Sequence, residues 1–230
     1  MSGLLAESEL SAPYSTNAKP ASHFAVASDT SFATPRQFRE LNPEVEFSLR
    51  NILTAEQIRM LETGSLDIGF LRLPIGGHSA LDVVTVHREP FVLVVPSSHK
   101  LAKRKRVRLR EVAGQDFVMY ERTYAPGFHD LIFGILRDAR IVPNVSQTAG
   151  ELPTLISLVD SRMGITILPA SAVKHSVASV VACEILDRIP MSEIGIAVSK
   201  GSRAAVVDNF RSFALKNLGH SRNALYANRG

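Results

Sequence analysis

The chain of 230 residues has little of several residue types on which whole classes of function depend. A single cysteine excludes an internal disulfide, which suits the reducing cytosol. Tryptophan is absent and aromatic residues amount to 7%, so there is little material for stacking on single-stranded bases. Residues 1–22 lack the basic and apolar regions of a secretory signal, and no apolar run approaches the ~18 residues of a membrane span. We expect a cytoplasmic protein with no membrane partner.

The sequence also lacks the short motifs that mark common active sites. It contains no G-x-S-x-G segment, P-loop or G-x-G-x-x-G segment, and its seven histidines show no H-x-x-x-H or H-x-H spacing. Cys183 lies in an apolar run and is interpreted as a buried small hydrophobe rather than a nucleophile. We therefore expect a protein that is not an enzyme and that carries no cofactor or metal.

What the chain does have is apolar sequence for a core, with 45% hydrophobic residues. Runs typical of strands alternate with segments of helical periodicity. Strands are expected at 22–28, 45–51, 66–70, 81–95 with a break at 87–90, 116–120, 142–147, 164–169, 179–186 and 194–198. Helices are expected at 34–43, 55–63, 127–139, 152–163 and 203–218. This order predicts an α/β fold with mostly parallel sheets, flanked by disordered segments at 1–21 and 219–230.

Polar side chains stand at three junctions where a strand gives way to a helix. Ser28 and Thr30 follow the first strand, while Thr54 and Thr148 each open a capping box, T-x-x-Q and T-x-x-E. Such residues usually only cap their helices. The free N–H groups of a helix N-terminus also suit a carboxylate, so the same residues could bind an anion.

Several segments carry a family resemblance. They are FRELNPEVEF (38–47), LETGSLDIGFLRLP (61–74), REPFVLVVPSSHKLA (88–102), LISLVDSRMGITILPAS (155–171) and the closing strand and helix from Ile194. With them, residues 24–218 resemble the effector-binding domain of LysR-type transcriptional regulators. The local sequence of these segments is most similar to that of the branch of the family that senses aromatic acids and ring-cleavage products such as benzoate and muconate.

The resemblance implies a fold like a type-2 periplasmic binding protein, with two α/β subdomains joined by two crossover strands and a small molecule in the cleft. Subdomain I would comprise 22–89 and 193–218, and subdomain II 90–192. The breaks at 87–90 and 187–190 agree with crossovers at those points. A homodimer or tetramer through subdomain I is implied as well.

The resemblance also places effector-binding residues. The family's positions correspond to Ser28, Thr54, Arg72, Phe128 and the adjacent Pro126, and the junctions above add Thr30 and Thr148. Hydroxyls and a helix N-terminus would hold a carboxylate, and the aromatic ring would face an apolar body. Phe128 could instead belong to the core face of its helix, and Arg72 could be an ordinary surface ion pair.

Two features depart from the family pattern. Family members begin with a winged helix-turn-helix, whereas residues 1–22 show no helical periodicity. We therefore expect a truncated product, an excised domain or a protein repurposed for sensing, with no specific DNA binding by this chain. The first helix is also about one turn shorter than usual, which bears on the dimer and on Ser28.

The positive charge of the chain is concentrated in the basic run KLAKRKRVRLR at 100–110. Seven of its eleven residues are Lys or Arg, and without them the net charge of +4 would become negative. We expect Val107, Leu109 and Val112 to face inward and the charges outward, as a solvated face. The competing interpretation is nonspecific, salt-sensitive attraction to phosphate or another acidic partner.

Three functions remain open at this point. The first is a ligand-sensing domain that binds a small organic acid, closes its cleft and reports through a changed oligomer. The second is an enzyme or transport-type binding protein on the same fold, against which the absent catalytic motifs and signal peptide argue. The third is an interaction protein that caps full-length relatives.

Overall fold

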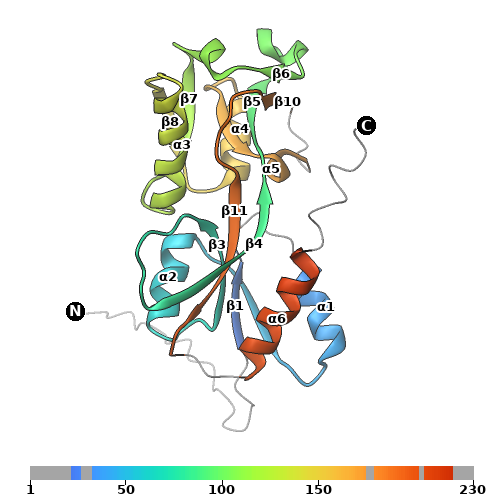
Figure 1. The fold of residues 1–230 in the computed structure, drawn as a ribbon. Helices are drawn as coiled ribbons and strands as arrows, with labels where there is room; N and C mark the ends of the chain where they lie inside the picture. The colour runs from blue at the N-terminus through green and yellow to red at the C-terminus, as the bar shows by residue number, and fades with distance from the viewer. Residues whose placement is uncertain (1–21, 27–32, 175–178, 202–204, 220–230) are drawn as a thin grey trace, which may run out of the picture.

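Residues 22–26, 33–174, 179–201 and 205–219 are described in the computed structural model of the chain. They form two lobes, each built on its own sheets (Figure 1). The terminal segments predicted to be disordered lie outside the described residues, except Gly219, which ends a helix.

The lower lobe holds a five-stranded sheet in the order β2-β1-β3-β11-β4, with helices on both faces (Figure 1). Its strands are β1 (Ser22–Val26), β2 (Phe47–Asn51), β3 (Ile68–Leu73), β4 (Leu81–Glu89) and β11 (Ser192–Ser199). Its helices are α1 (Ala33–Leu41), α2 (Thr54–Glu62) and α6 (Ala205–Gly219).

The upper lobe holds a four-stranded sheet, β6-β10-β5-β9, and a two-stranded sheet, β7-β8. Its strands are β5 (Phe91–Pro96), β6 (Arg106–Val107), β7 (Asp116–Tyr120), β8 (Asn144–Ala149), β9 (Thr166–Pro169) and β10 (Val180–Ile185). Its helices are α3 (Pro126–Asp138), α4 (Leu152–Asp160) and α5 (Ala170–Lys174), with short 3-10 turns η1 (Lys100–Lys103) and η2 (Leu109–Val112).

Two strands connect the lobes (Figure 1). β4 continues into β5 with only Pro90 between them, and the chain returns from β10 into β11. Because the two crossovers run in opposite directions, β11 pairs antiparallel with β3 and β4, and β5 pairs antiparallel with β9 and β10. The predicted α/β fold with two crossover strands is confirmed, but the prediction of mostly parallel sheets is wrong.

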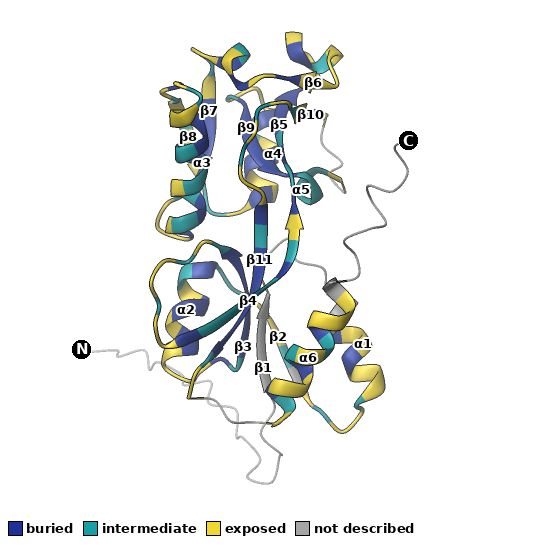
Figure 2. Cartoon of the chain, viewed as in Figure 1, coloured by how far each residue is buried: buried dark blue, intermediate teal, exposed yellow. Residues whose placement is uncertain are grey.

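The lower sheet carries a separate core on each face, and its strand β3 is mostly buried (Figure 2). Alternate residues of a strand point to opposite faces, so Phe70 of β3 packs edge-on against Phe210 of α6, whereas Leu71 packs with Leu61 of α2. Gly69 of β3 lies on the same face as Leu71, toward α2. A Cβ on Gly69 would come within 3.1 Å of the Leu61 side chain. The glycine therefore lets α2 pack closely on β3.

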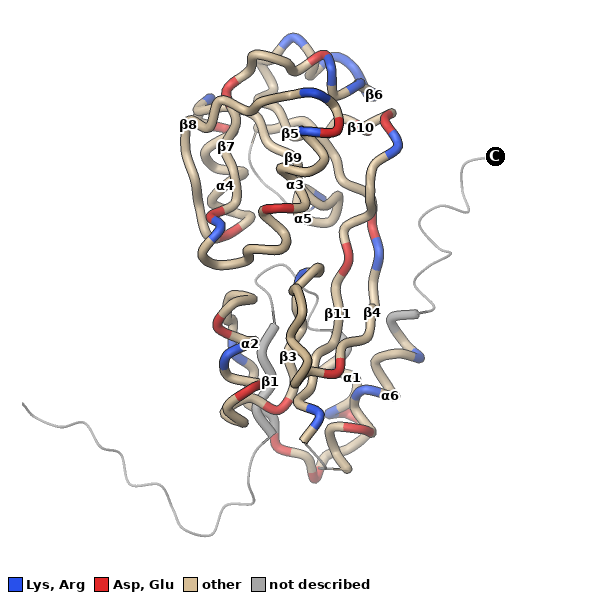
Figure 3. The backbone as a smooth tube through the Cα atoms, turned by 60° about the vertical axis from the view of Figure 1, so that its left-hand side comes forward, with Lys and Arg blue, Asp and Glu red and all other residues tan. Residues whose placement is uncertain are grey.

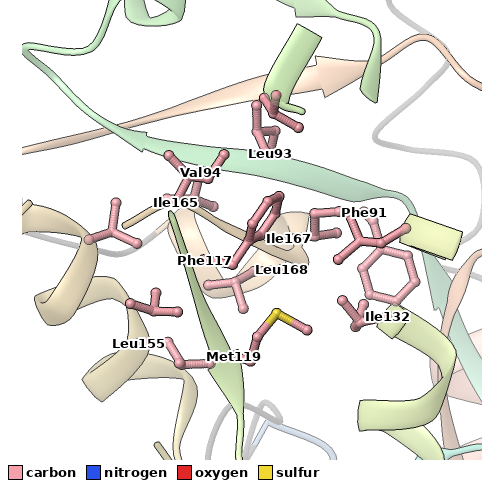
Figure 4. Packing of buried hydrophobic residues seen from close by; sticks show 14 of the residues in the cluster. Phe91, Leu93, Val94, Phe117, Met119, Ile132, Leu155, Ile165, Ile167 and Leu168 are labelled. Carbon is pink, nitrogen blue, oxygen red and sulfur yellow. The ribbon is translucent and has the colours of Figure 1, made fainter. Parts of the chain in front are cut away.

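The upper lobe has one continuous core (Figure 4). Phe117 and Met119 of β7 lie at its centre, between Ile132 of α3, Leu155 of α4 and Leu168 of β9. The apolar face of α3 is buried, and α4 ends at Asp160 rather than at the expected residue 163, so Met163 lies beyond the helix and is exposed.

The basic run forms the tip of the upper lobe, around η1, β6 and η2, remote from the lower lobe (Figure 3). All seven of its Lys and Arg residues are exposed. Val107, Leu109 and Val112 are buried, as predicted. Cys183 is also buried as predicted, with its sulfur against the carbonyls of Leu101 and Arg104.

Candidate functional site

The N-terminus of α2 faces the upper lobe. The helix begins at Thr54, and the residue before it, Leu53, is the N-cap with extended backbone. The side chain of Gln57 donates to the carbonyl of Ile52. The predicted capping box is therefore wrong, because Thr54 is already the first helical residue. The Thr54 side chain is buried.

A hydrogen bond joins this helix end to the upper lobe. The N–H of Ala55 donates to the carbonyl oxygen of Tyr124 over 2.9 Å. The first N–H groups of a helix have no partner within the helix and carry its partial positive charge. Tyr124 lies in the loop between β7 and α3, so one of these N–H groups is satisfied by the opposite lobe.

The lobes also touch at the N-terminus of α3. A Cβ on Gly127 would lie 1.8 Å from the carbonyl oxygen of Pro74, in the loop after β3. No side chain fits at that position while the two segments keep this spacing. Gly127 thus permits a backbone-to-backbone approach between the lobes.

A cavity of about 350 Å³ lies beside these contacts. It is lined by Glu121, Thr123, Tyr124, Thr148, Ala149 and Gly150. These residues follow or end β7 and β8, so the cavity lies at the carboxyl ends of two parallel strands, where α/β sheets commonly bind ligands. The Tyr124 ring rests on Gly150, where a Cβ would come within 2.6 Å of it.

Glu121 is the charged residue of the cavity. Its carboxylate accepts a hydrogen bond from Thr148 Oγ1 over 2.7 Å and a longer one from Thr123 Oγ1 over 3.4 Å. The hydrogen bond from Thr148 is the main reason why the pKa of Glu121 lies below its usual range, and Thr123 lowers it further. Thr148 itself lies in β8, and the N-cap of α4 is Glu151, so the second predicted capping box is also wrong.

Arg72 is buried between the lobes rather than paired at the surface, so that alternative is wrong. Its guanidinium donates to Ser192 Oγ over 3.2 Å and lies 5.3 Å from the centroid of the Phe128 ring. Burial lowers the pKa of Arg72 to about 10, against the opposing effects of Glu89 and Tyr120. Arg72 remains a cation at neutral pH and ties β3, β11 and α3 together.

Phe128 is a core residue of the upper lobe. Its ring packs against Tyr120 at a centroid distance of 5.5 Å and against Phe91 at 6.0 Å. Burial raises the pKa of Tyr120 to about 12. The structure therefore brings Arg72 and Phe128 together, with the ring shared between the core and the cation.

Glu89 was missed by the sequence reasoning. It ends β4 at the crossover, is buried, and accepts hydrogen bonds from the backbone N–H and hydroxyl of Ser171 at the start of α5. The available signal was a carboxylate directly before Pro90 inside an almost continuous apolar run. Buried carboxylates need such partners, so Glu89 fixes α5 against the crossover.

The other predicted residues are spread around these contacts. Pro126 is the exposed first residue of α3, beside the Gly127 contact. Tyr124 bonds to Ala55, the residue after Thr54, and lines the cavity together with Thr148, whereas Thr54 does not line it. Ser28 and Thr30 lie outside the described residues.

The described part of the chain contains neither a metal-binding cluster nor a membrane-spanning helix. No group of three or more His, Cys, Asp or Glu side chains gathers there as a metal site. No helix within the described ranges has the length and apolar character to cross a membrane.

The fold has close counterparts among solved structures. The effector-binding domain of BenM with its effector benzoate aligns with a TM-score of 0.76 at 20% identity, covering 87% of this chain and 93% of that one. The effector-binding domain of QuiR in complex with shikimate aligns with a TM-score of 0.79 at 18% identity, covering 90% of this chain and all of that one. The expected fold is thereby confirmed.

Sequence relatives are named as regulators. CatR of Pseudomonas putida, an HTH-type transcriptional regulator, is 30% identical over 175 residues, which are 75% of this chain and 60% of CatR. YnfL of Escherichia coli K12, an uncharacterized HTH-type transcriptional regulator, is 38% identical over 134 residues, which are 58% of this chain and 45% of YnfL. The chain spans about half the length of these relatives. Residues 25–219 match the LysR substrate binding domain, and the chain belongs to that family.

Proposed function

We propose that this chain is the ligand-sensing regulatory domain of a LysR-type transcriptional regulator and that it binds a small organic acid between its lobes. The observation that carries the proposal is the polar cavity at the carboxyl ends of β7 and β8, directly beside the N-terminus of α2. A helix N-terminus attracts a carboxylate, and the two lobes can close around it. BenM and QuiR, whose structures hold benzoate and shikimate, support this class of ligand.

In this proposal Thr54 and the N-terminus of α2 hold the carboxylate. Arg72 supplies a buried positive charge behind it, and Phe128 positions Arg72 through its ring face. Thr148 and Pro126 border the upper side, and Ser28 and Thr30 are proposed from the resemblance alone. The domain would bind its ligand without transforming it and would act in the cytoplasm, where a bacterial-type regulator meets DNA.

The lower lobe is proposed to pair with a second copy, as subdomain I. Three leucines support this: Leu41 of α1, Leu49 of the edge strand β2, and Leu215 of α6 are all exposed, Leu41 to 70%. Exposed apolar side chains on neighbouring elements favour an interface. Light scattering on purified protein should give a dimer or tetramer mass, and Leu41→Glu should shift it toward the monomer.

Thermal melting against benzoate, shikimate, aliphatic acids and neutral analogues tests the sensing function. A ligand that binds only the folded state stabilises it by about 2.7 kcal/mol at a hundredfold excess over Kd. We expect a selective rise in Tm that Thr54→Ala removes and Thr54→Ser keeps. Thr63→Ala, at the other end of α2, is the control, because Thr63 bonds only to that helix and to Ser65.

Two outcomes would favour other functions. Turnover of a candidate acid would point to an enzyme on this fold. An absence of any thermal shift in folded protein, together with co-purification of full-length relatives, would point to an interaction protein that caps them.

A further inference from the structure

We propose that the ligand carries, at the end opposite its carboxylate, an O–H or N–H donor group that binds Glu121. This inference rests on the proposed function and narrows its ligand class. It would make Glu121 the residue that distinguishes hydroxylated or aminated acids from plain carboxylic acids.

Three side chains of the cavity, those of Glu121, Thr123 and Thr148, offer hydrogen-bond acceptors rather than donors. The hydroxyls of Thr148 and Thr123 both point their protons at Glu121, so their lone pairs remain for a ligand. An ionised carboxylate is itself an acceptor only. These three side chains together therefore favour a donor on the ligand and disfavour a second carboxylate.

Two backbone N–H groups of the residues that line the cavity are already paired. The N–H of Glu121 donates to the carbonyl of Ala149 over 2.8 Å, and the N–H of Tyr124 donates to the carbonyl of Glu121 over 3.2 Å. These bonds hold the Glu121–Tyr124 turn against β8. The backbone that carries the Glu121 side chain is thus held in place, which lowers the entropy cost of binding a ligand through its carboxylate.

Two basic residues close to this turn in the chain or the fold, Arg122 and His129, hydrogen-bond to Asp130, and His129 also lowers the pKa of Glu121 as the smallest of its causes. Arg122 makes a two-point ion pair with Asp130, at 2.9 and 3.0 Å, and His129 also bonds to Asp130. None of the six residues that line the cavity is basic. Among the described residues, the charge that Glu121 presents is therefore not cancelled by a direct ion pair.

The position of the cavity sets the orientation of the ligand. Tyr124 lines it and also accepts the hydrogen bond from Ala55 at the start of α2. Glu121 and Tyr124 are the first and last residues of one hydrogen-bonded turn. The carboxylate of a ligand would be directed to the lower lobe, where the helix dipole is positive, and its donor group to Glu121 in the upper lobe.

Calorimetric titration at neutral pH with benzoate, para-hydroxybenzoate and para-aminomethylbenzoate tests the inference. The three acids share one ring and carboxylate and differ in having no donor, a hydroxyl or an ammonium. We expect at least one donor-bearing acid to bind at least tenfold more tightly than benzoate. Glu121→Gln should remove that advantage, so that the donor-bearing acid no longer binds more tightly than benzoate to this variant, while the control Glu111→Gln, on the remote tip of the same lobe, should preserve it.

A second pair of variants guards against a misfolded Glu121→Gln protein. Thr148→Val leaves Glu121 in place but removes its hydroxyl partner, so the pKa of Glu121, followed by NMR, should rise and the advantage should shrink. Thr148→Ser keeps the hydroxyl and should restore both. A donor advantage that persists when the pKa has risen in Thr148→Val would count against the ordering of Glu121 by Thr148.

Phenol and benzylamine, which lack the carboxylate, separate the two proposals. Equal affinity of the three acids, or an advantage that survives Glu121→Gln, overturns the role of Glu121 and leaves the acid-sensing function standing. Binding of phenol or benzylamine as tight as that of the matching acid, lost in Glu121→Gln, overturns the acid assignment and keeps Glu121. If folded protein binds none of the five compounds, both proposals fail for this ligand class.

Discussion

The lower lobe buries its apolar side chains on both faces of one sheet, whereas the upper lobe gathers them into a single cluster. In the lower lobe, α2 packs on one face and α1 with α6 on the other, so each core contacts only part of the lobe. In the upper lobe, α3, α4 and the strands share one core. The residues of one shared core are expected to unfold together, whereas one of two separate cores can unfold locally while the other stays packed.

Under the proposed function, each lobe would supply a different part of the ligand site. The upper lobe would supply Glu121, whose turn is bonded to β8 beside the continuous core. The lower lobe would supply the N-terminus of α2, which packs on the smaller of its two cores. The following tests would break or sharpen this comparison, from the largest expected effect to the smallest.

Large-to-small substitutions in the cores of the two lobes should have different effects on the reactivity of Cys183. Phe117→Ala in the upper lobe and Phe210→Ala in the lower lobe should each cost about 3–5 kcal/mol in the free energy of unfolding, measured by denaturant melts. Cys183 is the single thiol and is buried in the upper core, and its burial raises its pKa, so it reacts slowly with thiol reagents in the native fold. Phe117→Ala should accelerate its labelling, and Phe210→Ala should leave it slow.

One result of the labelling experiment would contradict this comparison. If Phe210→Ala accelerates labelling of Cys183 as much as Phe117→Ala does, the lobes unfold as one cooperative unit. The distinction between a shared and a divided core would then have no energetic consequence.

The tip of the upper lobe tests how far its core extends. Leu109 is fully buried in the basic run and belongs to the upper core, so Leu109→Ala should cost about 2–5 kcal/mol. Arg110 is its exposed neighbour, and Arg110→Gln should change the free energy of unfolding by no more than about 0.5 kcal/mol. Similar small effects for both would show that the tip is an appendage rather than part of the core.

Gly127→Ala should disturb the contact between the lobes. The added Cβ would meet the carbonyl of Pro74, and relieving such an overlap costs about 1–3 kcal/mol or moves the lobes apart. Small-angle scattering should report a larger radius of gyration. Gly134→Ala is the matched control on the same helix, because the nearest atom to its Cβ would be Arg137 Nη2 at 4.0 Å. An unchanged radius for Gly127→Ala would contradict the contact.

Two ion-paired carboxylates offer the smallest comparison. The pKa of Glu56 in the lower lobe is lowered mainly by the Arg59 side chain, and that of Glu111 in the upper lobe mainly by the backbone N–H of Arg108. Both contribute stability above the ordinary pKa of 4.5, which is lost as the pH falls through their lowered values. In about 1 M salt, screening should raise the pKa of Glu56 more than that of Glu111, as followed by NMR. Equal shifts would contradict these causes.

Features that depend on local periodicity were predictable from the sequence. The buried face of α3 follows from its apolar spacing, and the end of α2 follows from Gly64, which has a positive φ of 73°. The inward positions of the basic run were found in the same way. Each of these features is set by residues within a few positions of one another.

The capping boxes failed because a four-residue motif does not fix where a helix begins. Leu53 adopts the extended N-cap backbone, so Thr54 falls inside α2. Thr148 is taken up by β8, which pairs with β7, and its hydroxyl reaches Glu121 instead of a helix end. In both cases the surrounding packing decided the register of the motif.

The contacts between the lobes were beyond local patterns. The bond from Ala55 to Tyr124, the approach of Gly127 to Pro74 and the position of Arg72 over the Phe128 ring each join residues far apart in the chain. The family resemblance named Arg72 and Phe128 separately, as two of the effector-binding positions. Only the fold reveals that one lies over the ring of the other.

The place of β11 in the lower sheet has a consequence for synthesis of the protein. β11 lies between β3 and β4, although it is made more than a hundred residues after β3. All strands of the upper lobe, in contrast, lie in one continuous stretch that ends with β10. On a ribosome the upper lobe can therefore complete its strand pairing first, while β3 and β4 wait with unpaired edges. The late arrival of β11 fills that gap and makes the lower sheet the last part of the molecule to form.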